Sequence, residues 1–209
     1  MKIKLLSAIF AGLCSFALFA DVQLNNEQAA ECLKKAKETQ SSYLKFSYTR
    51  AARIGTMNVT SFAQVIDATN EIAKEVGFDN KQLIDEGAIV LGLWWWHGKF
   101  WKEAADYAFK VDNPRKYYIA SAYMNYPITD QERYNLIKEG FLKKYNFGNA
   151  DKLLTAFNNL LATAESLDNE AETKATLQKL NRIYTPLLVN QKDKYEKLVA
   201  AIRLAIQAY

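Results

Sequence analysis

Very few side chains in this 209-residue sequence have the chemistry of an enzyme's active site. His97 is the only histidine, and Cys32 is the only cysteine beyond the first twenty residues. A histidine that acts as a general base needs a carboxylate to orient it and a nucleophile within reach. Glu103 and Asp106 lie just beyond His97, but Cys32 is distant and no Gly-x-Ser-x-Gly segment is present. We therefore expect His97 to interact with the end of a helix rather than to transfer protons.

A pair of carboxylates is the other chemistry that the sequence could support. Helical hydrolases of glycans place one glutamate in an apolar pocket and need a second carboxylate nearby. Glu86 adjoins the apolar stretch that follows it, while Asp85 points about 100° away on a helix. A hydrolase of cell-wall or secreted polymers that uses Glu86 or Glu103 is therefore one alternative. We expect no metal or cofactor, because one histidine and one cysteine cannot form a structural zinc site and no glycine cluster could hold phosphates.

Aromatic residues are the most distinctive feature of the sequence. Trp94, Trp95 and Trp96 are adjacent, so on a helix they cannot all face one core. We expect Trp94 and Trp95 to be interior, whereas Trp96 and Trp101 flank the predicted turn at 97–98. Tyrosine and tryptophan combine an apolar face with a polar tip, which suits binding surfaces. The predicted partner-binding residues are Trp96, His97, Phe100, Trp101, Tyr117 and Tyr123.

Helices must position these residues. Apolar residues recur at intervals of three and four, and no long stretch alternates with period two. The sequence predicts an all-α protein of about nine antiparallel helices, arranged as stacked hairpins or as a compact bundle. The expected helix starts lie near residues 26, 61, 80, 99, 114, 130, 149, 170 and 190.

Local signals support several of these helices. Asp79 with Gln82, and Thr129 with Glu132, have the spacing of capping boxes. The stretch 87–96 carries no charge on any side, which predicts a central helix surrounded by protein. We expect Gly87 and Gly92 to let its neighbours approach closely.

Two successive segments, 80–114 and 114–149, have the length of one helical pair each. In the first segment, the residues that form a helix-and-turn pattern are Val90, Leu91, Trp94, Gly98 and Phe100. Those at the same offsets in the second are Ile119, Ala120, Tyr123, Pro127 and Thr129. Over residues 83–139 the sequence resembles tetratricopeptide repeats, although Glu103 and Glu132 occupy the offset where that family has a small alanine. The resemblance implies stacked helical hairpins.

The first twenty residues read as a cleaved secretory signal. Lys2 and Lys4 precede an uncharged apolar stretch over 5–19, and small residues lead up to Ala20. The apolar run of about 15 residues is shorter than the roughly 20 that cross a bilayer. We expect cleavage after Ala20, with Ala17 second, and a single domain over 21–209 without an integral membrane segment. The protein should be periplasmic or secreted, with Cys32 either buried or paired between molecules.

Charge argues against nucleic acid as a partner. The net charge of +4 falls to +2 without the first twenty residues, and no run of Lys and Arg exceeds two. Anionic lipid is disfavoured as the main partner on the same ground, because it too calls for clustered positive charge. The sequence therefore predicts an exported α-helical binding or scaffolding protein for a peptide, glycan or protein partner. The hydrolase above and a structural homo-oligomer are the alternatives.

Overall fold

The computed structural model describes residues 24–94 and 99–209, with the side chain of Trp94 also outside the description. These residues form ten α-helices and one 3-10 helix, without a strand among them, so the prediction of an all-α protein is confirmed. They divide into two compact units, the first ending at Asn113 and the second beginning at Pro114. The expected single domain over 21–209 stays a prediction, and each unit is described by itself.

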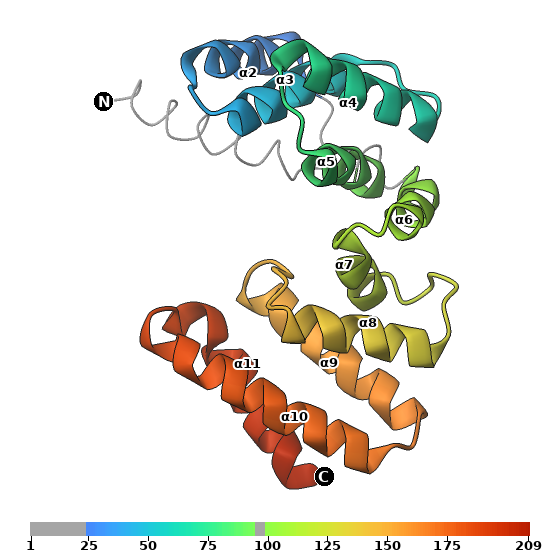
Figure 1. Cartoon of the computed structure of the whole chain (residues 1–209), viewed down its shortest axis with the longest axis vertical. Helices are drawn as coiled ribbons and strands as arrows, with labels where there is room; N and C mark the ends of the chain where they lie inside the picture. Colours follow the sequence, from blue (N-terminus) through green and yellow to red (C-terminus); the bar gives the residue numbers. More distant parts are fainter. Residues whose placement is uncertain (1–23, 95–98) are drawn as a thin grey trace. The chain divides into compact units, whose positions relative to one another are not determined.

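The described residues of the first unit form five α-helices, whose arrangement can be followed in Figure 1. They are α2 (Asn26–Glu38), α3 (Ser42–Thr56), α4 (Phe62–Val76), α5 (Lys81–Trp94) and α6 (Trp101–Lys110). Consecutive helices pack against each other through short connections. The boundaries follow from the sequence: the Ser61 hydroxyl accepts from the amide of Gln64 at the start of α4, and Gly77 ends it in the left-handed region at φ 68°.

Two sequence expectations for the first unit are wrong. The region between the expected starts at 26 and 61 holds two helices, because α2 ends before Thr39 and Ser41 caps α3 by accepting from the amide of Leu44. At the start of α5 the capping side chain is Asn80, which accepts from the amide of Leu83 at 3.2 Å. Asp79 therefore does not supply that cap.

The central position of α5 is confirmed over the residues described. Every residue from Gly87 to Leu93 is buried. A Cβ on Gly92 would lie 2.6 Å from the Cβ of Ala104, so this glycine lets α5 and α6 touch. A Cβ on Gly87 would collide with Nη1 of Arg50, whose buried guanidinium lies 5.6 Å from the ring centre of Phe46. Both glycines admit close neighbours, as the sequence predicted.

The second unit contains five α-helices and the 3-10 helix. They are α7 (Arg115–Ala122), α8 (Asp130–Leu142), α9 (Ala150–Ser166), α10 (Glu170–Tyr184), η2 (Thr185–Val189) and α11 (Lys192–Ala208). The capping box of Thr129 with Glu132 is present, and Asn149 and Asn169 cap α9 and α10. Pro186 lies in η2, so α10 cannot continue past Tyr184.

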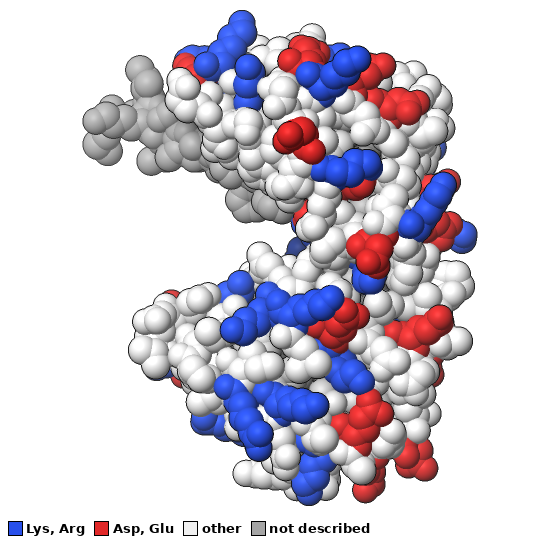
Figure 2. All heavy atoms as spheres, viewed as in Figure 1, with Lys and Arg blue, Asp and Glu red and all other residues white. Residues whose placement is uncertain are grey.

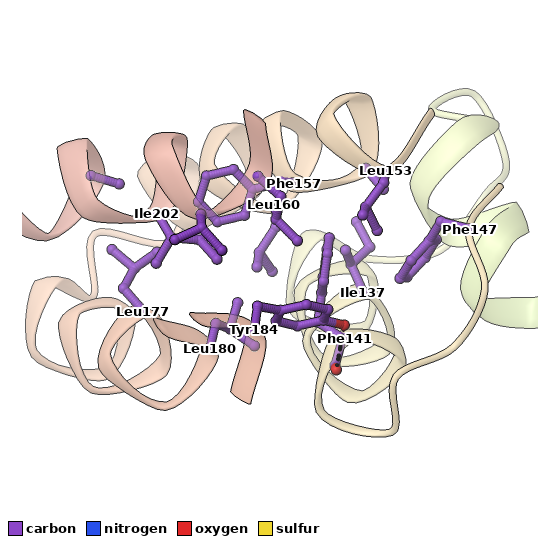
Figure 3. Packing of buried hydrophobic residues seen from close by; sticks show 14 of the residues in the cluster. Ile137, Phe141, Phe147, Leu153, Phe157, Leu160, Leu177, Leu180, Tyr184 and Ile202 are labelled. Carbon is purple, nitrogen blue, oxygen red and sulfur yellow. Dashed lines mark hydrogen bonds between the residues drawn. The ribbon is translucent and has the colours of Figure 1, made fainter. Parts of the chain in front are cut away.

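One apolar core joins α8, α9, α10 and α11 (Figure 3). Its largest enclosed side chains include Phe141, Phe157 and Tyr184. Phe141 meets the rings of Phe157 and Tyr184 edge-on, with centroids 6.2 and 6.0 Å apart. The Tyr184 hydroxyl donates to the carbonyl of Phe141 at 2.9 Å, which satisfies the only polar group of that ring inside the core. This core holds the helices of the second unit together.

Candidate functional site

The six residues predicted to bind a partner do not form one described cluster. Trp96 and His97 lie outside the described residues, as does Trp95. Phe100 and Trp101 belong to the first unit, and Tyr117 and Tyr123 belong to the second. The surface around each unit must therefore be considered separately.

In the first unit, Trp101 opens α6 and is half-buried. Phe100, directly before it, is buried with 5% of its surface exposed, and the Lys99 Nζ lies 5.3 Å from its ring centre. Phe100 therefore has little surface to give to a partner. Trp101 keeps a partly accessible face.

The carboxylates of the first unit separate into three environments. Asp85 is buried and accepts hydrogen bonds from the Lys81 ammonium and from the Tyr107 hydroxyl, the latter at 2.8 Å. Glu86 is half-buried, and Glu103 is exposed. The buried acid is therefore Asp85 rather than Glu86, and its oxygens bind neighbours on α5 and α6. The hydrolase alternative stays a prediction.

Two groups that donate to Asp85 have raised pKa values. Burial, followed by the hydrogen bond to Asp85, raises the pKa of Tyr107, so its hydroxyl remains a neutral donor near pH 7. Burial alone would lower the pKa of Lys81, but the hydrogen bond and charge of Asp85 outweigh it and raise that pKa. The phenol of Tyr107 thus ties α6 to α5, within which Lys81 and Asp85 form an ion pair. The i, i+4 spacing of Lys81 and Asp85 was a signal for it in the sequence.

In the second unit, Tyr117 is an interior residue with a polar edge. Its side chain is 5% exposed, and its ring meets Tyr145 edge-on at 5.6 Å. Its hydroxyl donates to Glu139 at 3.0 Å and accepts from the Lys143 ammonium at 3.2 Å. The Lys143 hydrogen bond lowers the pKa of Glu139 despite opposing burial. Tyr117 therefore joins α7 to α8 and offers almost no free ring surface.

A buried arginine organises the loop between α7 and α8. Arg133 lies in the first turn and a half of α8 and is 2% exposed. Its two terminal nitrogens donate to four main-chain carbonyls, those of Ala120 (2.7 Å), Tyr123 (3.2 Å), Met124 (3.1 Å) and Tyr126 (2.7 Å). Burial lowers the pKa of Arg133 and the charge of Asp130 opposes that effect, but a guanidinium remains charged in proteins. The guanidinium thus clamps the loop from its inner side.

Helix α7 and the loop that follows it carry partly exposed side chains next to each other, Arg115 and Tyr118 on the helix and Tyr123 and Met124 on the loop. Tyr118 and Tyr123 are half-buried and meet edge-on with centroids 6.3 Å apart. The Arg115 guanidinium lies 6.0 Å from the ring centre of Tyr118, and Met124 is 48% exposed. We call the four residues Arg115, Tyr118, Tyr123 and Met124 the loop surface.

The end of α7 beside the loop surface is held as well. Asn159 on α9 donates to the Ser121 carbonyl at 2.6 Å, and the Ser121 hydroxyl donates to the Tyr118 carbonyl at 2.9 Å. With Arg133, these bonds fix the backbone that presents Tyr118 and Tyr123. The loop surface is therefore ordered by groups beneath it.

Sequence reasoning found one of the four residues of the loop surface, Tyr123. Tyr118 was missed because it is adjacent to Tyr117 in the sequence, and only the packing distinguishes the buried ring of Tyr117 from the half-buried ring of Tyr118. Arg133 was missed because nothing in the sequence distinguishes an arginine that enters the interior from one on a solvated helix face.

Cys32 lies in α2 with none of its surface exposed, among Ala29, Ala51 and Ala52. This position corresponds to the buried thiol, one of the two states considered from the sequence. Within residues 24–94 and 99–209, no group of three or more His, Cys, Asp and Glu side chains could hold a metal ion. Nor does any helix in those ranges have the length and apolar character needed to span a bilayer.

Comparisons with family models, with curated proteins and with solved structures return no match for this chain.

Proposed function

We propose that this chain is an exported α-helical binding protein whose loop surface holds a peptide, glycan or protein partner. The half-buried tyrosines 118 and 123 supply two ring faces with polar tips, Arg115 supplies a cation, and Met124 an adaptable apolar contact. Trp101 of the first unit is a further candidate contact. Export to the periplasm or beyond rests on the predicted signal over residues 1–20.

The observation that carries the proposal is the clamp formed by Arg133. A buried guanidinium is expensive to desolvate, and here its hydrogen bonds go to the backbone of the last turn of α7 and of the loop that follows it. A loop that is already ordered loses less conformational entropy when a partner binds. The residues that contribute most to binding at protein interfaces are often aromatic, and here the aromatic side chains lie on an ordered backbone. The clamp and the rings above it therefore favour a recognition role over that of a simple connection.

The test compares the unaltered protein with a Tyr118→Ala, Tyr123→Ala variant. Two probe sets are used: random peptides displayed on phage, and soluble muropeptide fragments. Ligands selected on the unaltered protein should bind the double variant at least about tenfold more weakly, since truncation of a hot-spot aromatic costs more than about 1 kcal/mol. Tyr43→Ala is the matched control, because Tyr43 is a 43% exposed tyrosine of the first unit.

Equal binding by the double variant, or no ligand from either probe set, would refute the loop surface as the site. If the double variant is not folded by circular dichroism, amide chemical shifts of the unaltered protein decide instead. Ligand-induced shifts should then concentrate at residues 115–126, and shifts elsewhere would count against the proposal. Mass spectrometry of protein recovered from the periplasm tests export separately, with an N-terminus at Asp21 expected.

A further inference from the structure

The end of the second unit where α10 passes into α11 presents an apolar tip. Val189 in η2 is 84% exposed, more than any other large hydrophobic side chain in the described parts of the chain. Pro186 in the same turn is exposed, whereas Leu187 and Leu188 are half-buried and pack against the core. The turn is thus anchored by two leucines while Val189 stands out into solvent.

Three segments that are distant in sequence meet at this end. The Lys194 ammonium donates to the side chain of Asn146 at 3.2 Å, which joins the start of α11 to the α8–α9 loop. Lys197 and Asp151 form an ion pair at 2.8 Å between α11 and the start of α9. The Tyr184 hydroxyl reaches the Phe141 carbonyl, which joins the last residue of α10 to the end of α8. The ends of α8 and α10 and the starts of α9 and α11 therefore lie together.

This convergence concentrates positive charge. Residues 143–152 and 179–197 contain eight Lys and Arg against three Asp and Glu. The opposite end of the unit carries acidic side chains. Asp130 there accepts a hydrogen bond from the Ser166 hydroxyl, and Glu172 forms an ion pair with Lys138. Figure 2 shows this separation along the second unit, with Lys and Arg nearer one end and Asp and Glu toward the other.

Among the residues that the structure describes, several of these cations have no acidic partner. Lys144, Lys179 and Arg182 are exposed and form no ion pair within residues 24–94 and 99–209. Lys179 and Arg182 occupy the last two turns of α10, directly before the turn that carries Val189. We call these three cations, with Pro186 and Val189, the basic tip.

We propose that the basic tip docks on the surface of an anionic phospholipid bilayer. Val189 and Pro186 would enter the headgroup region, and Lys144, Lys179 and Arg182 would face the lipid phosphates. Exposed apolar groups combined with clustered cations are the composition that binds anionic interfaces. A single protruding turn offers too little apolar area for a stable protein interface, whereas shallow insertion into lipid needs only a few side chains. This proposal does not depend on the loop surface.

The experiment measures co-sedimentation of the protein, purified from the periplasm, with sucrose-loaded vesicles. One set contains phosphatidylglycerol and phosphatidylethanolamine, and the other contains phosphatidylcholine alone. A K144Q/K179Q/R182Q variant should bind the anionic vesicles about a hundredfold more weakly, since each cation near such a surface contributes about fivefold. V189D should weaken binding about tenfold or more through loss of apolar insertion.

Matched controls separate the basic tip from general charge. K34Q/K37Q/K45Q removes the same charge from exposed lysines of the first unit, and L204D alters a 68% exposed leucine of α11. Both should bind anionic vesicles within about twofold of the unaltered protein, because their positions lie outside the basic tip. Because all variants share one N-terminus, an uncleaved signal cannot produce a difference between them.

Three results would overturn the proposal. Equal binding to phosphatidylcholine vesicles would remove the role of anionic lipid. Equal losses in the K144Q/K179Q/R182Q and K34Q/K37Q/K45Q variants would show that only net charge matters. If V189D binds as well as the unaltered protein while soluble polyglutamate displaces the vesicles, the tip recognises acidic polypeptides and not lipid.

Discussion

Replacement of Arg133 by methionine should destabilise the second unit strongly. Methionine fills much of the same space but donates no hydrogen bond, so four carbonyls lose their guanidinium partner. The bonds to Ala120 and Tyr126 are buried and short, both at 2.7 Å, whereas those to Tyr123 and Met124 are part-buried and water can replace them. At about 1.5–2 kcal/mol for each buried bond from a charged donor, the free energy of unfolding should fall by about 3–4 kcal/mol.

The assay is urea unfolding followed by circular dichroism, combined with hydrogen exchange read by mass spectrometry. Exchange should rise first at residues 120–128, because the loop opens locally when the clamp is absent. Arg133→Lys is an informative comparison: one ammonium with three donors cannot reach all four carbonyls, so we expect roughly half of the loss. Arg203→Met is the matched control, because Arg203 is exposed on α11, and its effect should stay within about 0.5 kcal/mol.

Unfolding of Arg133→Met at the same urea concentration as the unaltered protein would refute a stabilising role for the clamp. That role is also refuted if Arg133→Lys is fully stable, since the paired geometry of the guanidinium would then be irrelevant. A loss of stability without faster exchange in the loop would mean that Arg133 supports α8 itself and not the loop surface.

Further consequences follow from the buried polar groups and the close contacts. Gly92→Ala should lower the free energy of unfolding by about 2 kcal/mol, because the new Cβ would collide with the Cβ of Ala104 and the ring of Phe62; unchanged stability in urea would contradict that packing. Burial raises the pKa of Tyr184, as it does that of Tyr107, so the folded state holds these phenolic protons more tightly than the unfolded state. Stability should therefore be complete below the ordinary tyrosine pKa of about 10 and decline as the pH rises above it, and Tyr184→Phe should make that decline shallower in urea unfolding measured across alkaline pH. Cys32 should react with a thiol reagent only after denaturation, and the native protein should run as a monomer in non-reducing electrophoresis; rapid labelling of the native thiol would contradict its complete burial.

Much of the fold could be predicted because its signals are local. Apolar periodicity and caps such as Ser61, Thr129 and Asn149 placed most helix starts within two residues. The helix α3 was missed because no glycine or proline separates it from α2, so that Ser41 alone marks the boundary. The uncharged stretch after Glu86 correctly indicated a buried helix, since its composition allows no solvated face.

The candidate sites depend on contacts between segments far apart in the sequence. Local patterns cannot distinguish the buried Tyr117 from the half-buried Tyr118, because both lie on the same short helix. Nor could they identify the basic tip: lysines interleaved with acids along the chain suggested no positive cluster, but folding brings the ends of four helices together. Burial of Arg133 likewise depends on a loop that closes around it.

The clamp of Arg133 has a consequence for how this protein could diversify. Its four bonds reach main-chain oxygens, which every amino acid possesses, so the clamp places no demand on the identity of the side chains at positions 123–125. Those positions could be exchanged while the path of the backbone is kept. The loop is therefore a natural site for a combinatorial library, in which new specificities would be selected on an unchanged scaffold.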